Sequence, residues 1–260
     1  ILGAQLNAQW ENQQLKSLLA IHLDPTAASL LWQQRDRILN QGELPAQEAI
    51  ATVMFIDIRG FTAVAEALPP QRLMRWLNQY LDAITQEITN RGGTVDKFVG
   101  DEVMAYFRLP PAEADPTALS QQALLAIETG LAVHERIQQL NQQLQRAGRD
   151  TIAVGIGIHT GPVSIGSMGS RHRLNYSMVG DTVNVAARLE ELNKVVVTGN
   201  PFSLLLSEAT YRAIGPRPLG DRFSYAPVGT FQLRGRTQPV CVYTVLPTPV
   251  YPTAQPAIIS

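Results

Sequence analysis

The sequence predicts an α+β fold in which a mainly antiparallel sheet forms in the order β-α-β-β-α-β, the ferredoxin-like arrangement, with extra strands at the C-terminal end. Two observations support this prediction. Short apolar runs rich in β-branched residues alternate with longer segments in which apolar residues recur every three or four positions. Glycine and proline pairs separate these segments. At 260 residues and 45% apolar content, the chain is long enough for one large domain with an appendage.

The chain divides into three regions. Residues 1–48 are rich in Gln, Leu and Ala and predict two short helices that form a connector or transducer segment, with a break at Asp24-Pro25. Residues 49–247 form the large domain, and residues 248–260 form a Pro-rich tail that we expect to be flexible. The chain starts at Ile and shows no signal-peptide pattern, so we expect it to be a fragment of a longer protein.

The first strand and the first helix of the domain are predicted from residues 51–90. The apolar run 51–57 predicts a buried strand, and the turn RGFT connects it to a helix that opens at Pro69-Pro70. Apolar residues from Leu73 to Ile88 recur at helical spacing, and Gly92-Gly93 ends the helix.

A β-hairpin is predicted at residues 95–107, VDKFVGDEVMAYF. Two β-rich apolar runs flank Gly100-Asp101, and a two-residue loop with Gly at its first position is typical of a type II′ turn. We therefore expect Asp101 at the hairpin tip.

The remaining elements are predicted from the same kinds of signal. A helix spans residues 117–146 and stops near Gly148, and a second hairpin is expected around Gly161-Pro162. A helix follows over 181–193, then a strand in the run VVVTGN, a short helix over 208–214, and two strands that pair around Arg234 to Arg236.

Charge and composition exclude several classes of function. With 21 basic and 22 acidic residues the net charge is -1, so the chain lacks the excess positive charge that is typical of proteins that bind nucleic acid. No apolar run approaches the ~20 residues needed to span a bilayer, so we expect a soluble, cytoplasmic domain. The single cysteine, Cys241, cannot form an internal disulfide, which favours a reducing compartment. The motifs of P-loop hydrolases and zinc enzymes do not occur in the sequence.

Asp57 and Asp101 are candidate metal ligands. Asp57 closes the strand 51–57 and Asp101 lies at the hairpin tip, so adjacent strands can bring both carboxylates to a divalent metal. The alternative is that each aspartate caps a turn, which is the commoner role of an Asp beside Gly. After Asp57, the glycine-bearing turn from Ile58 to Thr62 can present backbone N–H groups to a phosphate, although a plain strand-to-helix loop is the alternative.

Asn184 and Arg188 are candidate substrate contacts. They stand at i and i+4 and so project from one face of the helix predicted over 181–193. A solvated polar face is the alternative interpretation. A glycine-containing turn leads directly into this helix. A planar guanidinium suits the stabilisation of charge that develops on a phosphoryl group.

Four motifs in a fixed order carry a family resemblance. FIDIRGFT, DKFVGDEVMAYF, GIGIHTGPVSIGSMGS and YSMVGDTVNVAARLE together resemble the catalytic domain of class III nucleotidyl cyclases, and most of all bacterial, cyanobacterial-type adenylate cyclases. The resemblance covers about residues 50–246. It implies a homodimer with two active sites at the subunit interface, each completed by residues of both protomers.

The resemblance also implies a role for each residue that matches a family motif. Two divalent ions per site, Mg²⁺ or Mn²⁺, bind to carboxylates and one backbone carbonyl, and the substrate is ATP. The matching positions are Asp57, Asp101 and the Ile58 carbonyl for the metals; Gly60, Phe61, Thr62 and Arg234 for the phosphates, with Arg236 as the competing alignment; Lys97 and Ser177 for adenine; Asn184 for the ribose; and Arg188 for the transition state. Ser177 departs from the Thr or Asp that is usual in this subclass, and Arg234 from the usual Lys.

The implied reaction converts ATP to 3′,5′-cyclic AMP and pyrophosphate through two-metal-assisted attack of the ribose 3′-hydroxyl on the α-phosphate. Lys97 favours ATP because an ammonium group only donates hydrogen bonds, which suits adenine N1 and opposes the N1–H of guanine. The Ser177 hydroxyl can accept from the adenine N6 amine but can also donate, so the second contact is permissive.

Three alternatives stay open at this point. They are a guanylate cyclase of the same fold, a catalytically silent cyclase-like regulatory module, and a diguanylate cyclase of the GGDEF type, whose motif needs a second glycine where Val99 stands. We further expect the connector to relay signals from an upstream sensor domain of the same chain, which can anchor the full-length protein to a membrane.

Overall fold

The computed structural model describes residues 46–108, 115–149, 151–170, 173–196, 204–215, 219 and 223–248, together with Gln13 and Trp32. The predicted connector over 1–48 and the predicted tail over 248–260 thus lie almost entirely outside the described residues, although the first strand already begins at Gln47. No helix in the described part of the chain is long and apolar enough to cross a membrane.

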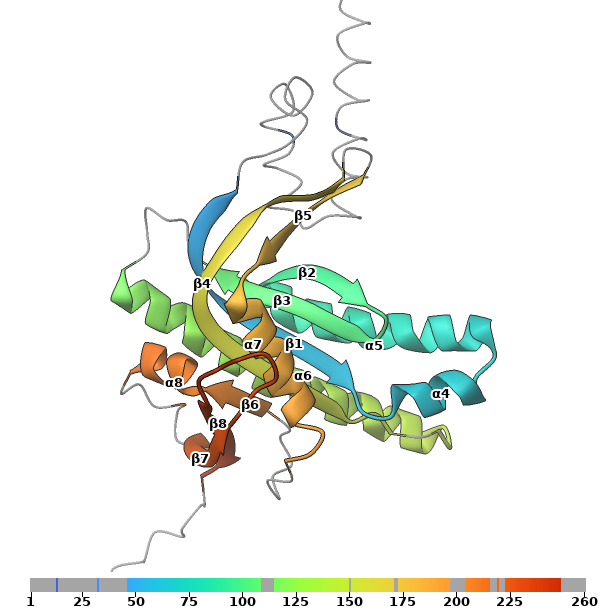
Figure 1. Ribbon diagram of the computed structural model, residues 1–260. Helices are drawn as coiled ribbons and strands as arrows, with labels where there is room; N and C mark the ends of the chain where they lie inside the picture. The colour runs from blue at the N-terminus through green and yellow to red at the C-terminus, as the bar shows by residue number, and fades with distance from the viewer. Residues whose placement is uncertain are drawn as a thin grey trace, which may run out of the picture.

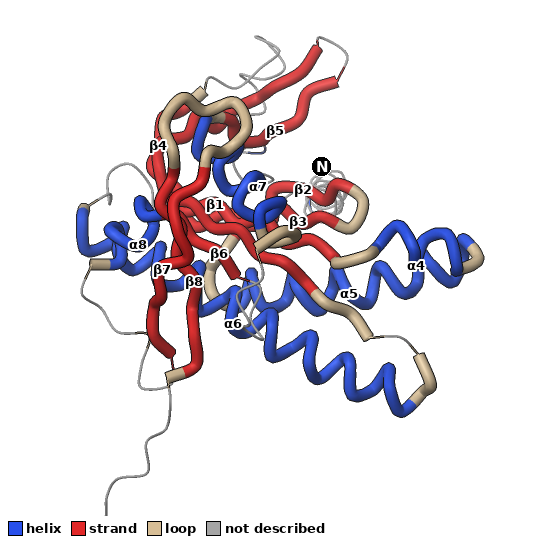
Figure 2. Tube along the Cα trace, turned by 60° about the horizontal axis from the view of Figure 1, so that its bottom comes forward, coloured by secondary structure: helices blue, strands red, loops and turns tan. Residues whose placement is uncertain are grey.

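One eight-stranded sheet organises the molecule (Figure 1). Its order is β2-β3-β1-β4-β6-β8-β7, and β5 pairs with β4 off this path. The pairing is antiparallel except between β4 and β6, and Figure 2 shows the β7 and β8 hairpin at one edge. The strands are β1 (Gln47–Ile58), β2 (Thr94–Val99), β3 (Glu102–Arg108), β4 (Val154–Ser170), β5 (Arg173–Val179), β6 (Leu204–Ser207), β7 (Phe223–Phe231) and β8 (Val240–Pro247).

Two long helices complete the predicted β-α-β-β-α-β unit, which is confirmed as β1, α5, β2, β3, α6 and β4. Helix α5 spans Pro70–Asn90 and opens with proline in its first turn, where the missing N–H costs nothing. Helix α6 spans Pro116–Arg146, and the Asp115 carboxylate caps it by accepting a hydrogen bond from the Ala118 N–H at 2.7 Å. Both helices bury their apolar stripes on the same face of the sheet (Figure 1).

A further helix, α7 (Asp181–Leu192), lies on the opposite face of the sheet. Its Ala186 is fully buried in a cluster with Val53 of β1 and Met104 of β3, whereas α5 and α6 pack against the alternate residues of the same strands. A ferredoxin-like unit carries its helices on one face of the sheet, which holds for α5 and α6 and does not hold for α7.

The hairpin predicted at Gly100-Asp101 is confirmed between β2 and β3. Gly100 has φ 65° and no residue other than glycine in the described part of the chain has a positive φ, which fits the type II′ assignment with Gly first. This turn places Asp101 at the same end of the sheet as the end of β1, because β3 pairs with β1 as far as Ile56.

The hairpin predicted at Gly161-Pro162 is wrong, because both residues lie inside the continuous strand β4. On the edge away from β1, β4 pairs with β6 only over Ile156–Ile158 and with β5 only from Ser164. The Pro162 carbonyl accepts a hydrogen bond from the Thr182 hydroxyl at 2.6 Å and so points to this unpaired stretch. Both backbone polar groups of a strand residue face the same side, so the proline nitrogen points there too. The missing N–H therefore breaks no ladder hydrogen bond.

Two smaller differences concern short segments. Most of the strand expected in VVVTGN, residues 197–200, lies outside the described residues, and Val195 stands in a turn after α7. The strand that directly precedes the short helix over 208–214 is β6. A short helix α4 (Phe61–Ala67) follows directly on the turn after β1 and was not predicted, while the short helix over 208–214 is confirmed as α8 (Glu208–Ile214).

Candidate active site

Asp57 and Asp101 line one cavity of about 490 Å³ at the end of the central strands. Asp57 is the second-last residue of β1, and Asp101 stands in the turn between β2 and β3. The structure therefore brings together six of the residues that were assigned to metals and phosphates, namely those on the first strand, in the turn after it and at the hairpin tip. The cavity is lined by Asp57, Ile58, Arg59, Gly60, Phe61, Thr62, Asp101, Asn193 and Lys194.

The carboxylates of this cavity repel one another. Burial raises the pKa of Asp101 to about 7, and the neighbouring Asp57 carboxylate adds to this shift. The pKa of Glu102 is also raised to about 7, mainly by burial and then by the charge of Asp57. Such crowding of acidic groups is what a bound cation relieves.

The donor set fits a divalent ion that also binds the substrate. No group of three or more His, Cys, Asp or Glu side chains suited to a metal occurs within the described residues. Mg²⁺ is usually held by one or two carboxylates together with substrate phosphates and water, rather than by a cage of protein ligands alone. Asp57, Asp101 and the Ile58 carbonyl provide that kind of partial site.

The turn into α4 brings backbone amides to the same cavity. Gly60 has φ 70° and ψ 21°, a left-handed conformation that glycine adopts without steric cost and that joins β1 directly to the helix. Phe61 and Thr62 are the first helical residues, whose N–H groups have no partner within a helix. The Phe61 ring stacks on Trp76 of α5 at a centroid distance of 6.3 Å, which fixes the start of α4.

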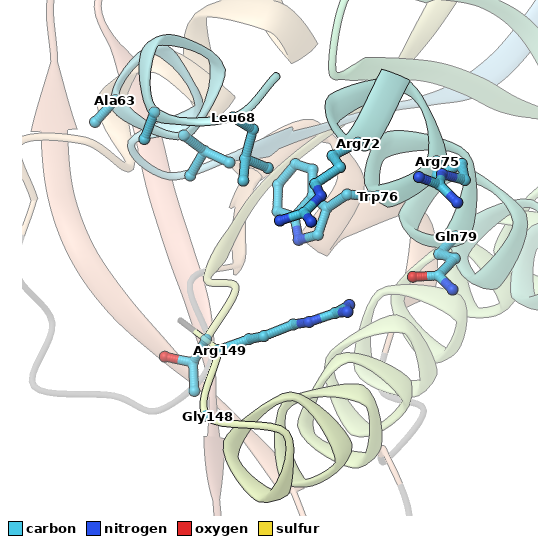
Figure 3. Close-up of a pocket in the computed structure, with 11 residues that line it drawn as sticks. Ala63, Leu68, Arg72, Arg75, Trp76, Gln79, Gly148 and Arg149 are labelled. Atoms are coloured by element: carbon cyan, nitrogen blue, oxygen red, sulfur yellow. The ribbon is translucent and has the colours of Figure 1, made fainter. Parts of the chain in front are cut away.

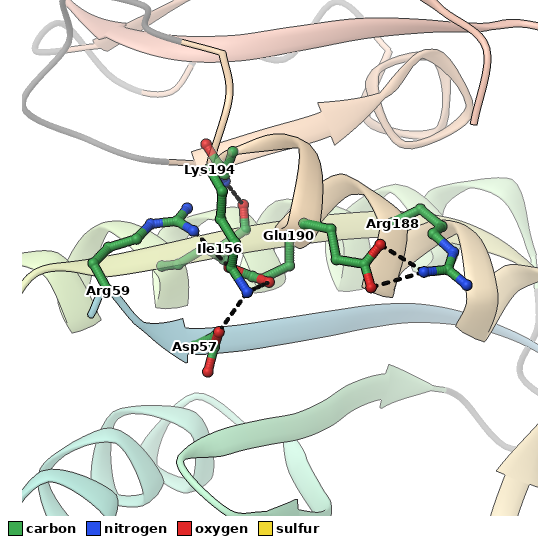
Figure 4. A network of polar contacts seen from close by, with 8 residues as sticks. Asp57, Arg59, Ile156, Arg188, Glu190 and Lys194 are labelled. Atoms are coloured by element: carbon green, nitrogen blue, oxygen red, sulfur yellow. Dashed lines mark hydrogen bonds and ion pairs between the residues drawn. The ribbon is translucent and has the colours of Figure 1, made fainter. Parts of the chain in front are cut away.

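A network of four charged side chains links the cavity to α7 (Figure 4). Lys194 Nζ lies 2.8 Å from Asp57 Oδ2 and 3.4 Å from Glu190 Oε2, and Arg59 Nη1 lies 3.1 Å from Glu190 Oε1. The Glu190 side chain is fully buried. A Cβ on Gly155 of β4 would stand 1.8 Å from the Arg59 guanidinium, so this glycine makes room for the network.

The charges of the network balance inside the protein. Burial raises the pKa of Glu190, while Lys194 and Arg59 oppose that shift. Burial alone would lower the pKa of Lys194, but Asp57 and Glu190 outweigh it and raise the pKa. Sequence reasoning missed these residues, although the i, i+4 spacing of Glu190 and Lys194 was a signal that could have paired them.

Asn184 and Arg188 do not line the cavity of Asp57 and Asp101. Asn184 is exposed on α7, and Arg188 Nη1 donates to both carboxylate oxygens of Glu191 at 2.6 and 2.7 Å. Figure 4 shows Lys194 reaching Asp57 while Arg188 turns away along α7. Within one chain, the residues assigned to the ribose and the transition state are therefore separate from those assigned to the metals.

Lys97 and Ser177 form another group, which also lies outside that cavity. Their side chains meet at Asp96, whose Oδ2 accepts a hydrogen bond from the Ser177 hydroxyl at 2.8 Å and lies 3.3 Å from Lys97 Nζ. The two residues assigned to adenine thus come together from β2 and β5, although 80 positions separate them in the sequence. Asp96 was not among the predicted site residues.

The two C-terminal arginines differ in their partners. Arg236 Nη1 lies 2.7 Å from Asp181 Oδ2 at the start of α7, whereas Arg234 is exposed in the turn after β7. His159 on β4 is a packed strand histidine. Its Nδ1 lies 2.6 Å from the Ser207 hydroxyl, and burial lowers its pKa to about 4.

A larger cavity of about 770 Å³ lies between α4, α5 and the segment after α6 (Figure 3). Arg72, Arg75, Trp76 and Arg149 are among its lining residues, and none of the described residues that line it is acidic. None of the predicted site residues lines it. We therefore assign the chemistry to the smaller cavity, which holds the carboxylates.

Comparisons with known proteins match the chain to adenylate and guanylate cyclases. A family model described as the adenylate and guanylate cyclase catalytic domain matches residues 45–246. Adenylate cyclase 1 of Rhizobium meliloti is 34% identical over 195 residues, which cover 75% of this chain and 27% of that protein, so the chain spans about a quarter of the relative's length. The crystal structure of the adenylyl cyclase CyaB from P. aeruginosa has a TM-score of 0.68 at 32% identity and covers 80% of this chain and 98% of its own. The guanylyl cyclase Cya2 has a TM-score of 0.64 at 31% identity and covers 78% of this chain and 94% of its own.

Proposed function

The chain belongs to the family of adenylate and guanylate cyclase catalytic domains, and we propose that it converts ATP to 3′,5′-cyclic AMP and pyrophosphate. In this reaction the ribose 3′-oxygen forms a bond to the α-phosphorus and loses its proton, while the bond from the α-phosphorus to the bridging oxygen breaks and pyrophosphate leaves. The names of the relatives from Rhizobium and Pseudomonas support ATP as the substrate.

Two divalent ions, Mg²⁺ or Mn²⁺, would be held by Asp57, Asp101 and the Ile58 carbonyl, which line one cavity. When bound there, they supply acidification of the 3′-hydroxyl and neutralisation of the departing pyrophosphate. The chain itself orients the triphosphate through the amides of Gly60, Phe61 and Thr62 at the start of α4.

The observation that carries the proposal is the division of the site residues into separate half-sites. One chain holds the metal and phosphate residues in a cavity, while Asn184 and Arg188 are turned away from it. A two-fold axis brings different surfaces of identical subunits together, so a homodimer can complete each cavity with α7 of the partner. We infer that Asn184 then positions the ribose and that Arg188 stabilises the charge of the transition state.

Base choice follows from hydrogen-bond polarity. Lys97 donates to adenine N1 and opposes the N1–H of guanine, and Ser177 accepts from the adenine N6 amine. Lys97 and Ser177 lie close enough to share Asp96 as a partner, so both can meet one base. This pairing disfavours a guanylate cyclase.

The test is to give the purified protein ATP or GTP with Mg²⁺ or Mn²⁺ and to identify the nucleotide products. We expect cyclic AMP from ATP and little product from GTP. In Asp57→Asn, turnover should fall by more than ~100-fold, because changes outside the ligands alone cost about 10–100-fold at metal sites. Asp82→Asn is the matched control, since Asp82 is exposed on α5 and, among the described residues, accepts a hydrogen bond from the neighbouring Gln86 alone.

Other outcomes would count against the proposal. Cyclic GMP as the main product would replace ATP by GTP as the substrate. No product with either nucleotide, from folded and dimeric protein, would favour a silent regulatory module. Activity of Asp57→Asn near that of Asp82→Asn would remove Asp57 from the metal site.

A further inference from the structure

Asp96 occupies an irregular position in β2. Val95 pairs with Ala105 of β3 and Lys97 pairs with Met104, so two steps along β2 correspond to a single step along β3. Asp96 is therefore the additional residue of a β-bulge. Bulges interrupt the alternation of side chains and re-aim them, and they are frequent beside active sites.

The bulge places two consecutive side chains on one face of the sheet. Val95 packs into the core under α5 and α6, whereas Met104 belongs to the cluster on the face of α7. Lys97 is paired with Met104 and so shares its face, and Asp96 follows Val95 and so points to the face opposite to that of Val95. In a regular strand Asp96 and Lys97 would point in opposite directions.

This arrangement fixes the proton of the Ser177 hydroxyl. Ser177 Oγ donates to Asp96 Oδ2 at 2.8 Å, and Lys97 Nζ lies 3.3 Å from the same oxygen. The Asp96 side chain is 3% exposed and Ser177 is 4% exposed, so water does not compete freely for this bond. A carboxylate that is paired with an ammonium group accepts hydrogen bonds only, and the hydroxyl must then donate to it.

We propose that Asp96 is a positioning residue that sets the base specificity of the site by making Ser177 a hydrogen-bond acceptor only. With its proton committed to Asp96, the hydroxyl offers only lone pairs to a base, while Lys97 offers only donors. This pair matches adenine, which presents an acceptor at N1 and a donor at N6, and it opposes guanine at both positions. The inference rests on the proposed function, and it makes the second base contact selective rather than permissive.

The test compares Asp96→Asn with the unmodified protein through kcat/KM for ATP and for GTP. An amide can donate to Ser177 Oγ as well as accept from it, so the hydroxyl becomes free to donate to guanine O6. The ATP/GTP ratio of kcat/KM should fall about tenfold, the order expected for one hydrogen bond. Asp82→Asn on the surface of α5 should leave the ratio unchanged.

A double-mutant cycle with Ser177→Ala separates the two possible routes. If Asp96 acts through Ser177, then adding Asp96→Asn to Ser177→Ala should change the ratio by less than about twofold, since no hydroxyl remains to orient. A tenfold change that persists without the hydroxyl means that Asp96 acts through Lys97, and it overturns the proposal. An unchanged ratio in folded Asp96→Asn also overturns it. Asp96→Ser serves if Asp96→Asn does not fold, because two facing hydroxyls leave the proton direction open.

The outcome is distinguishable from failure of the proposed function. The same ratio can be measured without turnover, as the ratio of Kd values for non-cyclisable α,β-methylene analogues of ATP and GTP. Protein that forms no cyclic nucleotide but prefers the ATP analogue, and loses that preference in Asp96→Asn, contradicts the function and supports the inference. Active protein whose preference survives the substitution supports the function and contradicts the inference.

Discussion

Mixing two inactive variants tests whether each active site draws on two chains. The variants are Asp57→Ala, which removes a carboxylate from the metal cavity, and Arg188→Ala, which removes the guanidinium of α7. Both lesions should leave the fold intact. The Arg188–Glu191 pair is 33% and 55% exposed, and exposed ion pairs contribute only ~0.2–1 kcal/mol to stability. Lys194, the partner of Asp57, is 47% exposed and can turn to water.

The expected recovery follows from symmetry. Each homodimer carries the same lesion in both sites and should be nearly inactive. In a mixed dimer one site receives both lesions, whereas the other receives Asp57 from the Arg188→Ala chain and Arg188 from the Asp57→Ala chain. Random exchange at equal concentrations makes half of the dimers mixed, and each has one intact site, so about a quarter of the unmodified activity should return.

The assay measures cyclic AMP formation after the two proteins are mixed and subunit exchange is verified with two different affinity tags. The matched control mixes Asp57→Ala with Asp101→Ala. Both residues line the cavity of a single chain, so every site in that mixed dimer lacks one of them and no activity should return. No recovery in the test mixture would refute the composite site and place the catalytic residues within one chain. Recovery in the control would instead mean that Asp57 and Asp101 of one chain do not serve the same site.

Three further predictions concern single residues. Glu190→Gln should lower the free energy of unfolding, measured by urea titration, by about 3 kcal/mol, because it leaves the guanidinium of Arg59 without its buried partner. The control is Glu191→Gln at an exposed position, which should change this free energy by less than ~0.5 kcal/mol. Lys97→Glu should lower kcat/KM for ATP and permit some use of GTP, because a carboxylate accepts a hydrogen bond from guanine N1–H. An unchanged preference for ATP over GTP in nucleotide assays would exclude Lys97 as a base contact. Below pH 6.5 the unfolded His159 takes up a proton that the folded residue, with a pKa of about 4, does not, so the contribution of His159 to stability should fall by up to about 3 kcal/mol between pH 6.5 and 4. The difference in unfolding free energy between the unmodified protein and His159→Gln should therefore change by that amount over this range, whatever the buried carboxyl groups Asp101 and Glu102 add to both profiles.

Elements with a strong local signal were predictable from the sequence. Helix α5 follows from the apolar spacing after Pro70, and the hairpin at Gly100 follows from a turn that only a few residue pairs satisfy. Gly161-Pro162 looks equally like a turn but lies within β4. Its proline is tolerated because the strands on the edge of β4 away from β1 stop short of it, and that gap is a property of the assembled sheet which no local pattern reveals.

Part of the candidate site could not be predicted from the sequence either. The positions of Asp57 and Asp101 at one cavity follow from strand ends and turns, which local sequence predicts. The contact of Asp96 with Ser177 depends on a bulge that shifts the register of β2 by one residue, and on a strand 81 positions away. The pairing of Lys194 with Asp57 spans 137 positions and depends on where α7 packs. Such contacts are set by tertiary packing rather than by propensity.

Helix α7 has two different tasks in the proposed dimer. Residues two positions apart on a helix point about 200° away from each other, so Arg188 and Glu190 lie on nearly opposite sides of α7. Arg188 faces outward, where it can enter the partner's cavity, while the fully buried Glu190 holds Arg59 and Lys194 beside the cavity of its own chain. In the proposed dimer, the same helix would therefore complete one active site and hold residues beside the other. If that dimer forms, a displacement of α7 would move Arg188 away from one nucleotide and disturb Asp57, through Lys194, at the second, so this helix would link the two sites.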